Sequence, residues 1–579
     1  MKTLISPSTK RNWEKLGTDG SDRLMKRANK TSSEKRILPV EYVTDPSSIA
    51  LVRRLTEENG ERIKEPERLL CAVAEALLRE RGILEKPHVQ AVLQEYLPEG
   101  GAKLTTFAEG EIPTGERDLL GLLYQSMLPE GQKNQCGSYY TPHEIVTNMT
   151  ADLVFSEGQT FLDPCCGSGS FLLALDNAKP EQLYGFDRDP VAVMIAKVNL
   201  LLKYPDRVFV PQILCLDYLE NGTAGTWQSG QQAKYYDYIA TNPPWGALVG
   251  EGQFVSGVAS KETFSGFFMK AYEQLKDGGK IRFLFPEAIF QAKMHRGFRT
   301  FLLENCHIER ITRYDSMFSG VSTGVIDISC LRESPEPHLY LCDRDSKWKI
   351  PLSVFRETKN CVFCFPTKDE YRVLRRIREM GRYDLSDSIW ALGIVTGDNK
   401  GKLKSVMEDG CEAIYTGKEI ERYTLKPARK YLHYDRSNLQ QVAREEYYRA
   451  PEKLVYRFVS NRLIFAYDNS KSLFLNSANI LIPRIPNMGI KTVLAFLNSD
   501  LFQFFYTRIF GDIKVLRGNL EELPFPRITE EQDLYLEQLT ERIIAEEAGL
   551  DSALQKEIFS LYGLSEEQIA LVRKSLSMV

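Results

Sequence analysis

The chain has no long hydrophobic run, no internal repeat and no low-complexity tract. Its 579 residues hold no apolar stretch near the length of about 18 that a membrane-spanning helix needs, and the first residues lack the apolar segment of a secretory signal. The eleven cysteines are odd in number and scattered, which is typical of reduced thiols rather than of a disulfide framework. These absences favour a cytoplasmic protein, and the length favours about two to four domains.

Histidine is also scarce, with six in the whole chain. One set has an order that zinc ligands can use: His338 and Cys342, followed by Cys361 and Cys364. Both pairs lie in strand-like segments, HLYLCD and CVFCFP, so we interpret the four residues as packing side chains. The sequence thus predicts no metal site, and zinc at these four residues is the alternative.

Charge is unevenly distributed around a net value of −4. Residues 1–36 carry ten Lys and Arg against four Asp and Glu, residues 391–520 carry twenty against thirteen, and residues 528–579 carry four against eleven. A basic tract can therefore contact phosphates while an acidic tail keeps the total negative. On these counts alone, solvated surface charge explains the pattern equally well.

Apolar spacing divides the chain into regions of different character. After a polar, basic arm, residues from about 62 to 96 have the spacing of helices. Between 159 and 286, five short apolar runs alternate with helical segments, which predicts an α/β fold. We expect a Rossmann-like, doubly wound parallel sheet with helices on both faces. The helix expected over 263–279 has two glycines as its stop signal.

The rest of the chain is less regular. Apolar and polar residues alternate between frequent turns after about 335, which predicts a mixed α+β domain, and two helical patterns close the chain. We therefore expect four parts. They are a basic arm and helical region at 1–110, the α/β domain at 111–335, the mixed domain at 336–530 and C-terminal helices at 531–579.

Polar or Gly-rich motifs follow the expected strands, and in parallel sheets ligands lie beyond the carboxyl ends of the strands. DPCCGSGSF (163–171) follows the first strand, and Gly167 and Gly169 allow a ligand to approach the backbone. Asp187 closes the second strand, where a carboxylate can accept both ribose hydroxyls of a nucleoside; Asp217 closes the third, where it can accept the amino group of adenine. No lysine follows the glycines as a P-loop requires, so S-adenosylmethionine fits better than a nucleoside triphosphate, and better than NAD.

These motifs occur in a specific order. The first set is GSYYTP (137–142), DPCCGSGSF (163–171), GFDRDP (185–190), LDYL (216–219), NPPW (242–245) and MFSGVSTGVIDI (317–328). This order resembles the gamma class of DNA adenine-N6 methyltransferases. A second set resembles the C-terminal specificity domain of TaqI-like and Eco57I-like enzymes: GIVTGDNK (393–400), YTGKEIERY (415–423), LNSANI (475–480), AFLNSDLFQFFY (495–506) and LEELPFPR (520–527). The resemblance covers about 110–530.

The resemblance implies roles for individual residues. The residues expected to bind S-adenosylmethionine are Tyr140, Thr141, Pro142, Asp163, Gly167, Gly169, Phe171, Asp187, Asp217 and Asn242. Those expected to act in catalysis are Asn242, Pro243, Pro244 and Trp245, and those expected to stack on the target base are Trp245 and Phe318. Trp245 departs from the Tyr that is commonest in the family, which keeps a ring face and loses a hydroxyl.

The NPPW motif then has a chemical rationale. The exocyclic amine of adenine is a poor nucleophile because its lone pair is conjugated with the ring. The side-chain oxygen of Asn242 and the carbonyl of Pro243 can accept its two N–H groups and free the lone pair for in-line attack on a methyl group. Because a base inside a duplex cannot reach such a pocket, it must be flipped out, and stacking on Trp245 compensates part of the lost base stacking.

Double-stranded DNA is therefore the expected partner, at the nucleoid of a bacterial or archaeal cell, with a separate restriction endonuclease or defence-system subunit as a candidate second partner. The basic tract at 391–520 would contact the DNA phosphates. Two alternatives stay open: an RNA or protein (glutamine) N-methyltransferase, and a non-catalytic DNA-recognition subunit. The first 110 residues hold no convincing Pro-Asp…Glu-x-Lys arrangement of a nuclease, so we expect modification without cleavage.

Overall fold

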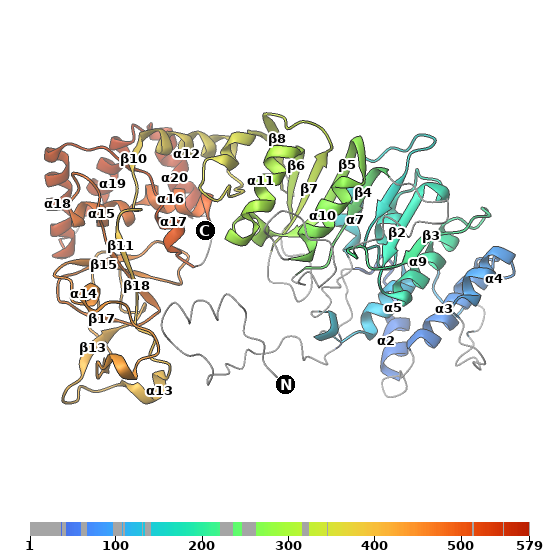
Figure 1. The fold of residues 1–579 in the computed structure, drawn as a ribbon, viewed down its shortest axis with the longest axis horizontal. Helices are drawn as coiled ribbons and strands as arrows, with labels where there is room; N and C mark the ends of the chain where they lie inside the picture. The colour runs from blue at the N-terminus through green and yellow to red at the C-terminus, as the bar shows by residue number, and fades with distance from the viewer. Residues whose placement is uncertain are drawn as a thin grey trace. The chain divides into compact units, whose positions relative to one another are not determined.

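The computed structural model forms two compact units, one running to Cys361 and the other starting at Val362 (Figure 1). No helix in the part of the chain that the structure describes is long and apolar enough to cross a membrane. The described residues are 36, 42–58, 66–96, 107, 110–129, 131–133, 141–220, 235–245, 262–314, 324–343, 346–511, 514–547 and 549–577.

The first unit is built on a nine-stranded sheet with the order β3-β2-β1-β4-β5-β7-β6-β8-β9. The strands are β1 (Phe161–Asp163), β2 (Leu183–Asp187), β3 (Gln212–Cys215), β4 (Tyr236–Thr241), β5 (Leu275–Pro286), β6 (His307–Tyr314), β7 (Val325–Leu331), β8 (His338–Cys342) and β9 (Lys347–Pro351). The first five are the strands predicted from the sequence, and they pair in parallel. The α/β fold class is therefore confirmed.

The sheet is not parallel throughout, which corrects the expectation of a purely parallel sheet. β7 runs antiparallel to both β5 and β6, β8 is parallel to β6, and β9 is antiparallel to β8. We call β3, β2, β1 and β4 the parallel half, and β5, β7, β6, β8 and β9 the mixed half. Because β8 and β9 belong to this sheet, the first compact unit extends to Cys361, beyond the expected boundary at 335.

Helices cover both faces of the sheet, as the doubly wound pattern predicts. They are α7 (His143–Thr150), α8 (Ser170–Ala174), α9 (Pro190–Lys203), α10 (Thr263–Glu273) and α11 (Arg296–Asn305). Neighbouring residues of β5 show the two faces, since successive side chains of a strand point to opposite sides. Arg282 bonds the Asn148 carbonyl of α7, whereas the ring of Phe283 packs against Phe268 of α10. The expected glycine stop of α10 is wrong, because the helix ends at Glu273 and its two glycines lie in β5.

The mixed half holds a buried ion pair in the middle of its strands. The guanidinium of Arg282, on β5, donates to both carboxylate oxygens of Asp327, on β7, and a third nitrogen donates to the Asn148 carbonyl at 2.8 Å. Arg282 is 1% exposed and Asp327 is fully buried. Because each charge finds its partners inside the protein, the pair is compatible with burial.

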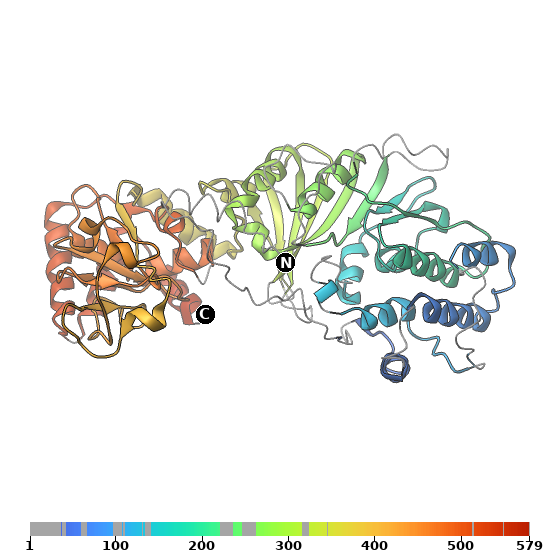
Figure 2. The same ribbon diagram turned by 60° about the horizontal axis from the view of Figure 1, so that its bottom comes forward.

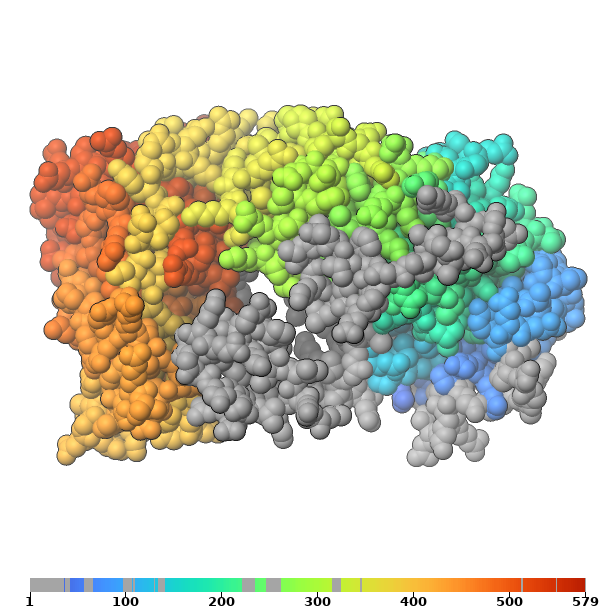
Figure 3. Space-filling model, in the orientation of Figure 1, coloured from blue at the N-terminus to red at the C-terminus, as the bar shows by residue number. Residues whose placement is uncertain are grey.

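The helical region near the N-terminus packs on the parallel half. Its helices are α2 (Ser48–Glu58), α3 (Pro66–Glu80), α4 (Pro87–Gln94) and α5 (Leu119–Met127). Of these, α3 and α4 lie in the range of about 62–96 where the apolar spacing predicted helices. α3, α4 and α5 all contact α9, and Figure 2 shows the blue helices alongside it. In the space-filling view the blue residues adjoin the teal and green ones (Figure 3). This region and the sheet therefore share one core.

The second unit mixes helices with small sheets, which confirms the expected mixed α+β domain. Two sheets have four strands each, with the orders β11-β18-β15-β16 and β12-β14-β13-β17, and β10 pairs with β19. The strands are β10 (Gly381–Tyr383), β11 (Ile389–Leu392), β12 (Leu403–Lys404), β13 (Glu412–Tyr415), β14 (Lys430–Leu432), β15 (Lys453–Arg457), β16 (Phe465–Asp468), β17 (Leu473–Phe474), β18 (Ala478–Ile482) and β19 (Phe525–Pro526).

The helices of the second unit include the two that close the chain. They are α12 (Lys368–Met380), α13 (Asn399–Lys402), α14 (Glu445–Tyr448), α15 (Ile490–Leu497), α16 (Asp500–Ile509), α17 (Arg517–Leu520), α18 (Glu530–Ile544), α19 (Leu550–Leu561) and α20 (Glu566–Ser577). Thr529 and Gln532 form a capping box at the start of α18, which satisfies free N–H groups of its first turn. α15 packs against β15 and β16, and α18 packs against α15 and α19.

Candidate active site

The Gly-rich turn between β1 and α8 is held by backbone hydrogen bonds. Cys166 N donates to Phe186 O of β2 at 2.8 Å, and Gly169 N donates to Cys166 O at 2.8 Å. Gly167 and Gly169 have φ angles of 53° and 92°, a conformation that glycine adopts without strain. The two glycines thus allow the chain to reverse tightly above the carboxyl end of the sheet.

Asp187, the last residue of β2, fixes this turn from below. Its Oδ2 accepts from Gly167 N at 2.9 Å and its Oδ1 accepts from Asp189 N at 2.9 Å. Burial raises the pKa of the carboxyl group. Since each oxygen of an ionised carboxylate can accept more than one hydrogen bond, Asp187 can hold the turn and still accept the hydroxyls of a ligand.

Asp163, at the end of β1, ties the Gly-rich turn to the NPPW motif. The residue is 1% exposed, and its Oδ1 accepts from Thr241 Oγ1 at 2.6 Å and from Cys165 N at 3.2 Å. Cys165 Sγ lies 2.9 Å from Thr241 Oγ1 and 3.5 Å from the Asn242 carbonyl oxygen. Burial raises the pKa of Asp163 to about 7. This network fixes the loop after β1 against the loop after β4.

A cavity of about 470 Å³ lies at the carboxyl ends of the parallel strands. Ligand pockets for small molecules typically have volumes of about 300–1,000 Å³. The residues that line it are Tyr124, Leu128, Gln132, Lys133, Pro164, Cys165, Gly167, Asp187, Arg188, Asp189, Leu216, Asp217, Tyr218, Asn242, Pro244 and Phe267. The turns after β1, β2, β3 and β4 all contribute, which is the arrangement expected of an open α/β sheet.

The structure brings five of the predicted site residues together in this lining: Gly167, Asp187, Asp217, Asn242 and Pro244. The lining does not include the other described ones: Thr141, Pro142, Asp163, Gly169, Phe171, Pro243 and Trp245. Of these, Asp163 and Phe171 are buried beneath the turn. The remaining two predicted residues, Tyr140 and Phe318, lie outside the described part of the chain.

The NPPW motif continues directly from β4, which ends at Thr241. Asn242 and Pro244 reach the cavity, and Thr263 Oγ1 fixes the motif by donating to the Pro244 carbonyl at 2.9 Å. Trp245 is partly buried against the core shared with α9, and its Nε1 donates to Leu284 O of β5 at 3.4 Å. The indole is thus held on one side by β5 while part of its surface stays exposed.

Thr141 and Pro142 precede α7 without capping it by a side chain. Pro142 is the residue at the N-cap, and no side-chain hydrogen bond caps the helix. Thr141 is buried and lines a separate hollow of about 40 Å³ together with Asp118 and Ser170. The expected role of Thr141 and Pro142 in binding a cofactor stays a prediction.

Several residues of the cavity were missed by sequence reasoning. Tyr124, Leu128, Gln132 and Lys133 come from α5 and the segment after it, which precedes the family motifs. Phe267 comes from α10 and stacks on Tyr218, with ring centroids 5.5 Å apart. Their apolar spacing indicates buried helix positions only, so the sequence holds no signal that separates them from ordinary core residues.

The cysteines named as a zinc alternative give no support to a metal site. Within the described residues, no three His, Cys, Asp or Glu side chains are grouped as a metal ion would require. Cys342 and Cys364 are buried.

Comparison with known proteins supports the reading of both units. Residues 115–333 match the family model described as N-6 DNA Methylase, and residues 412–525 match the TaqI-like C-terminal specificity domain. The fold is similar to that of a solved structure of the Type IIL restriction-modification enzyme MmeI in complex with DNA. The TM-score is 0.55 and the identity 13%, and the match covers 91% of this chain and 94% of MmeI.

Curated relatives match part of the chain. The chain is 30% identical to the Type II methyltransferase M.VspI of Vibrio sp. (strain 343) over 313 residues, 52% of this chain and 74% of that protein. It is 25% identical to the Type I restriction enzyme EcoEI methylase subunit of Escherichia coli over 234 residues, which are 36% of this chain and 46% of that subunit. The chain therefore belongs to the N-6 DNA methylases of restriction–modification systems and carries a TaqI-like specificity domain.

Proposed function

We propose that this chain transfers a methyl group from S-adenosylmethionine to N6 of an adenine in a specific sequence of double-stranded DNA. The observation that carries this proposal is the single cavity lining that joins Gly167, Asp187, Asp217 and Asn242 from the turns after four neighbouring strands. One wall can hold a nucleoside, and the other presents the Asn-Pro-Pro motif. The role in the cell would be that of a modification enzyme in a restriction–modification or phage-defence system.

The residues present fit S-adenosylmethionine. Asp187 offers acceptor oxygens for ribose hydroxyls, Asp217 lies after β3 where it can accept an adenine amino group, and the Gly167 backbone reaches the cavity. Carboxylates also suit a cofactor that carries a positively charged sulfonium and an ammonium group. When bound, the cofactor supplies an electrophilic methyl group.

Asn242 is the residue assigned to the target amine. Its side chain and the neighbouring Pro243 carbonyl are the acceptors for the two N–H groups, and proline fixes the backbone so that these acceptors need little reorganisation. The loop is held from three sides, since Cys165 contacts the Asn242 carbonyl, Thr263 bonds the Pro244 carbonyl and Trp245 bonds β5. These contacts would hold the two acceptors in place for the target amine.

DNA recognition is assigned to the second unit. It contains the region that matches the TaqI-like specificity domain and the basic tract at 391–520. Lysine and arginine side chains there would neutralise phosphates, while other side chains read base edges. A restriction endonuclease or another subunit of the same system is the proposed protein partner.

The proposal is tested by sequencing, with a method sensitive to methylation, the DNA of cells that express the wild type or Asn242→Ala. We expect N6-methyladenine at one sequence motif with the wild type and none with the variant. Loss of an acceptor aimed at the transition state costs on the order of 10²- to 10³-fold in rate. No new mark from a wild type that binds S-adenosylmethionine would move the substrate to RNA or protein. Absence of cofactor binding would favour the non-catalytic alternative.

The expectation of modification without cleavage has its own test. Purified protein is incubated with Mg²⁺ and unmodified DNA that carries the motif found by sequencing. We expect intact DNA, and cuts at a fixed distance from that motif would contradict the proposal.

A further inference from the structure

The α5 helix holds the Gly-rich turn through its N-cap residue, Asp118. Ser168 Oγ, at the tip of the turn, donates to Asp118 Oδ2, and Asn199 Nδ2 of α9 donates to Asp118 Oδ1 at 2.7 Å. Asn199 also donates to the Ser168 carbonyl at 3.0 Å, and Gly121 N donates to Asp118 at 2.8 Å. A Cβ on Gly121 would lie within 2.6 Å of the carboxylate atoms, so the glycine is what lets Asp118 fold back over α5.

The same helix holds the second turn through Tyr124. Its hydroxyl donates to Asp189 Oδ2 at 2.7 Å, and both residues line the cavity. Asp189 Oδ1 caps α9 by accepting from Val191 N, and Asp189 N donates to Asp187. A continuous set of hydrogen bonds therefore runs from Tyr124 through Asp189 and Asp187 to the backbone of Gly167.

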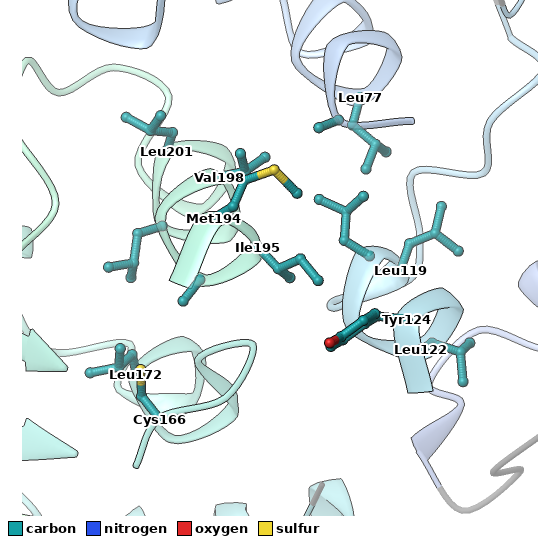
Figure 4. Close-up of a cluster of buried hydrophobic side chains, with 14 of the residues drawn as sticks. Leu77, Leu119, Leu122, Tyr124, Cys166, Leu172, Met194, Ile195, Val198 and Leu201 are labelled. Atoms are coloured by element: carbon teal, nitrogen blue, oxygen red, sulfur yellow. The ribbon is translucent and has the colours of Figure 1, made fainter. Parts of the chain in front are cut away.

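Packing makes α5 a rigid base for both contacts. Figure 4 shows Leu119, Leu122 and Tyr124 of α5 in one cluster with Ile195 and Met194 of α9. The cluster continues to the Gly-rich turn through a further pair, Cys166 and Leu172. The cavity wall extends from Tyr124 to the segment just after the helix, which reaches it at 128, 132 and 133.

We propose that α5 is part of the cofactor site, with Asp118 and Tyr124 as positioning residues that set the affinity for S-adenosylmethionine by fixing the turns after β1 and β2. The inference rests on the proposed function of the cavity and adds residues that lie before the family motifs. Neither side chain is assigned a chemical step. Their effect should therefore appear in cofactor binding and be small in the rate at saturation.

The first experiment measures binding of S-adenosylmethionine alone to Tyr124→Phe by calorimetry. Losing one hydrogen bond to a carboxylate should raise the Kd about 5- to 20-fold, while kcat at saturating cofactor stays within about twofold. The matched control is Tyr204→Phe, which removes a hydroxyl that donates to the Ala178 carbonyl at 2.9 Å, away from the cavity. We expect the control to bind as the wild type does.

A double-mutant cycle separates positioning from loss of stability. Asp189→Asn keeps an oxygen for the α9 cap and replaces the acceptor for Tyr124 by an amide nitrogen, which can only donate to the hydroxyl. The bond to a charged carboxylate is lost, so Tyr124→Phe should weaken binding less in that background than in the wild type. Equal Kd values for Tyr124→Phe and the wild type would overturn the inference, as would equal weakening by Tyr204→Phe. A wild type that does not bind S-adenosylmethionine would instead overturn the proposed function.

The second experiment compares two buried carboxyl groups two residues apart. Asp118→Asn weakens the bond from Ser168, and we expect the cofactor Kd to rise about tenfold. Glu116→Gln is its control, since Glu116 is buried and accepts from Thr44 and Asp45 without contacting the turn. Lower thermal stability in both variants with a raised Kd only in Asp118→Asn supports the proposal, and an equal Kd in both overturns it.

Discussion

The parallel half and the mixed half of the sheet use polar side chains in opposite ways. In the parallel half they stand at the carboxyl ends of strands, where Asp187, Asp217 and Asn242 reach the cavity. In the mixed half, Arg282 and Asp327 stand within their strands, bond each other and are almost fully buried. In this sheet, polar side chains at the ends of strands can contact a ligand, whereas those in the middle of strands stabilise the fold.

Asp163 shows that the distinction depends on more than position. It ends β1, as Asp187 ends β2, yet it contacts Thr241 and Cys165 and does not line the cavity. Its acceptor capacity is directed to the loop that carries Asn242. The end of β1 therefore supports the site through Asp163, while residues at the ends of β2, β3 and β4 line the cavity.

The largest expected effect is on the mixed half, where Asp327→Ala removes the buried carboxylate partner of Arg282 and leaves only the partly exposed Asp152, at 3.2 Å, as an ion-pair partner. Breaking a buried ion pair in this way costs about 3–5 kcal/mol of unfolding free energy. Urea unfolding would measure the loss, with Asp277→Ala as control, because Asp277 pairs with Arg332 but is 96% exposed and should contribute less than about 1 kcal/mol. Under conditions where the variant is folded, its affinity for S-adenosylmethionine should equal that of the wild type. A raised Kd for S-adenosylmethionine would show that the ion pair of the mixed half also affects the cofactor site, which contradicts the assignment of ligand binding to the parallel half alone.

A smaller effect is expected at Asp163, and it depends on pH. Burial raises the pKa of this carboxyl to about 7, so between about pH 4 and 7 the folded state binds a proton that the unfolded chain releases. Its contribution to stability is therefore present at low pH and is lost as the pH rises through about 7. Asp163→Asn cannot ionise and keeps the Oδ1 acceptor for Thr241 and Cys165.

The measurement is the difference in unfolding free energy between Asp163→Asn and the wild type at pH 5 and pH 8. From pH 5 to pH 8, the unfolding free energy of the variant should rise by roughly 2–4 kcal/mol relative to that of the wild type. Asp118, with a pKa raised to about 6, and Asp187 titrate in both proteins, so to first order their effects cancel in the difference. A difference that does not change with pH would show that Asp163 is ionised throughout.

The sequence predicted the parallel half well because its signals are local. Each of its strands is a short apolar run that ends at, or within two residues of, an acid or an asparagine. Asp187 and Asp217 were predicted from that position, whereas Asn242 was predicted from the family resemblance. The mixed half could not be read in the same way. Whether the segment HLYLC joins this sheet depends on its pairing with β6, Arg310 with Tyr340, which no local pattern encodes.

The part of the site that α5 supplies was missed for a related reason. Tyr124 lies on a helix whose spacing predicts only that it faces a core. Its contact with Asp189, 65 positions along the chain, exists because α5 packs on α9. Asp118 likewise looks like an ordinary helix cap until the structure shows Ser168 and Asn199 on the same carboxylate. Long-range packing, rather than residue type, makes these side chains part of the site.

The smallest expected effect is at Trp245. This residue follows β4 of the parallel half, and its indole donates to β5 of the mixed half. Trp245→Phe keeps an aromatic face and loses a hydrogen bond of 3.4 Å, so kcat/KM should fall by less than about fivefold. Trp245→Ala removes the aromatic face and should lower kcat/KM about 10- to 100-fold, because stacking of a base on an aromatic ring contributes about 1–3 kcal/mol.

Fluorescence of 2-aminopurine at the target position would report base flipping directly. Trp348→Ala, on the edge strand β9, is the control and should leave that signal unchanged. If Trp245→Phe and Trp245→Ala are equally impaired, the indole acts through its hydrogen bond to β5 and stabilises the loop, and it does not stack on the base.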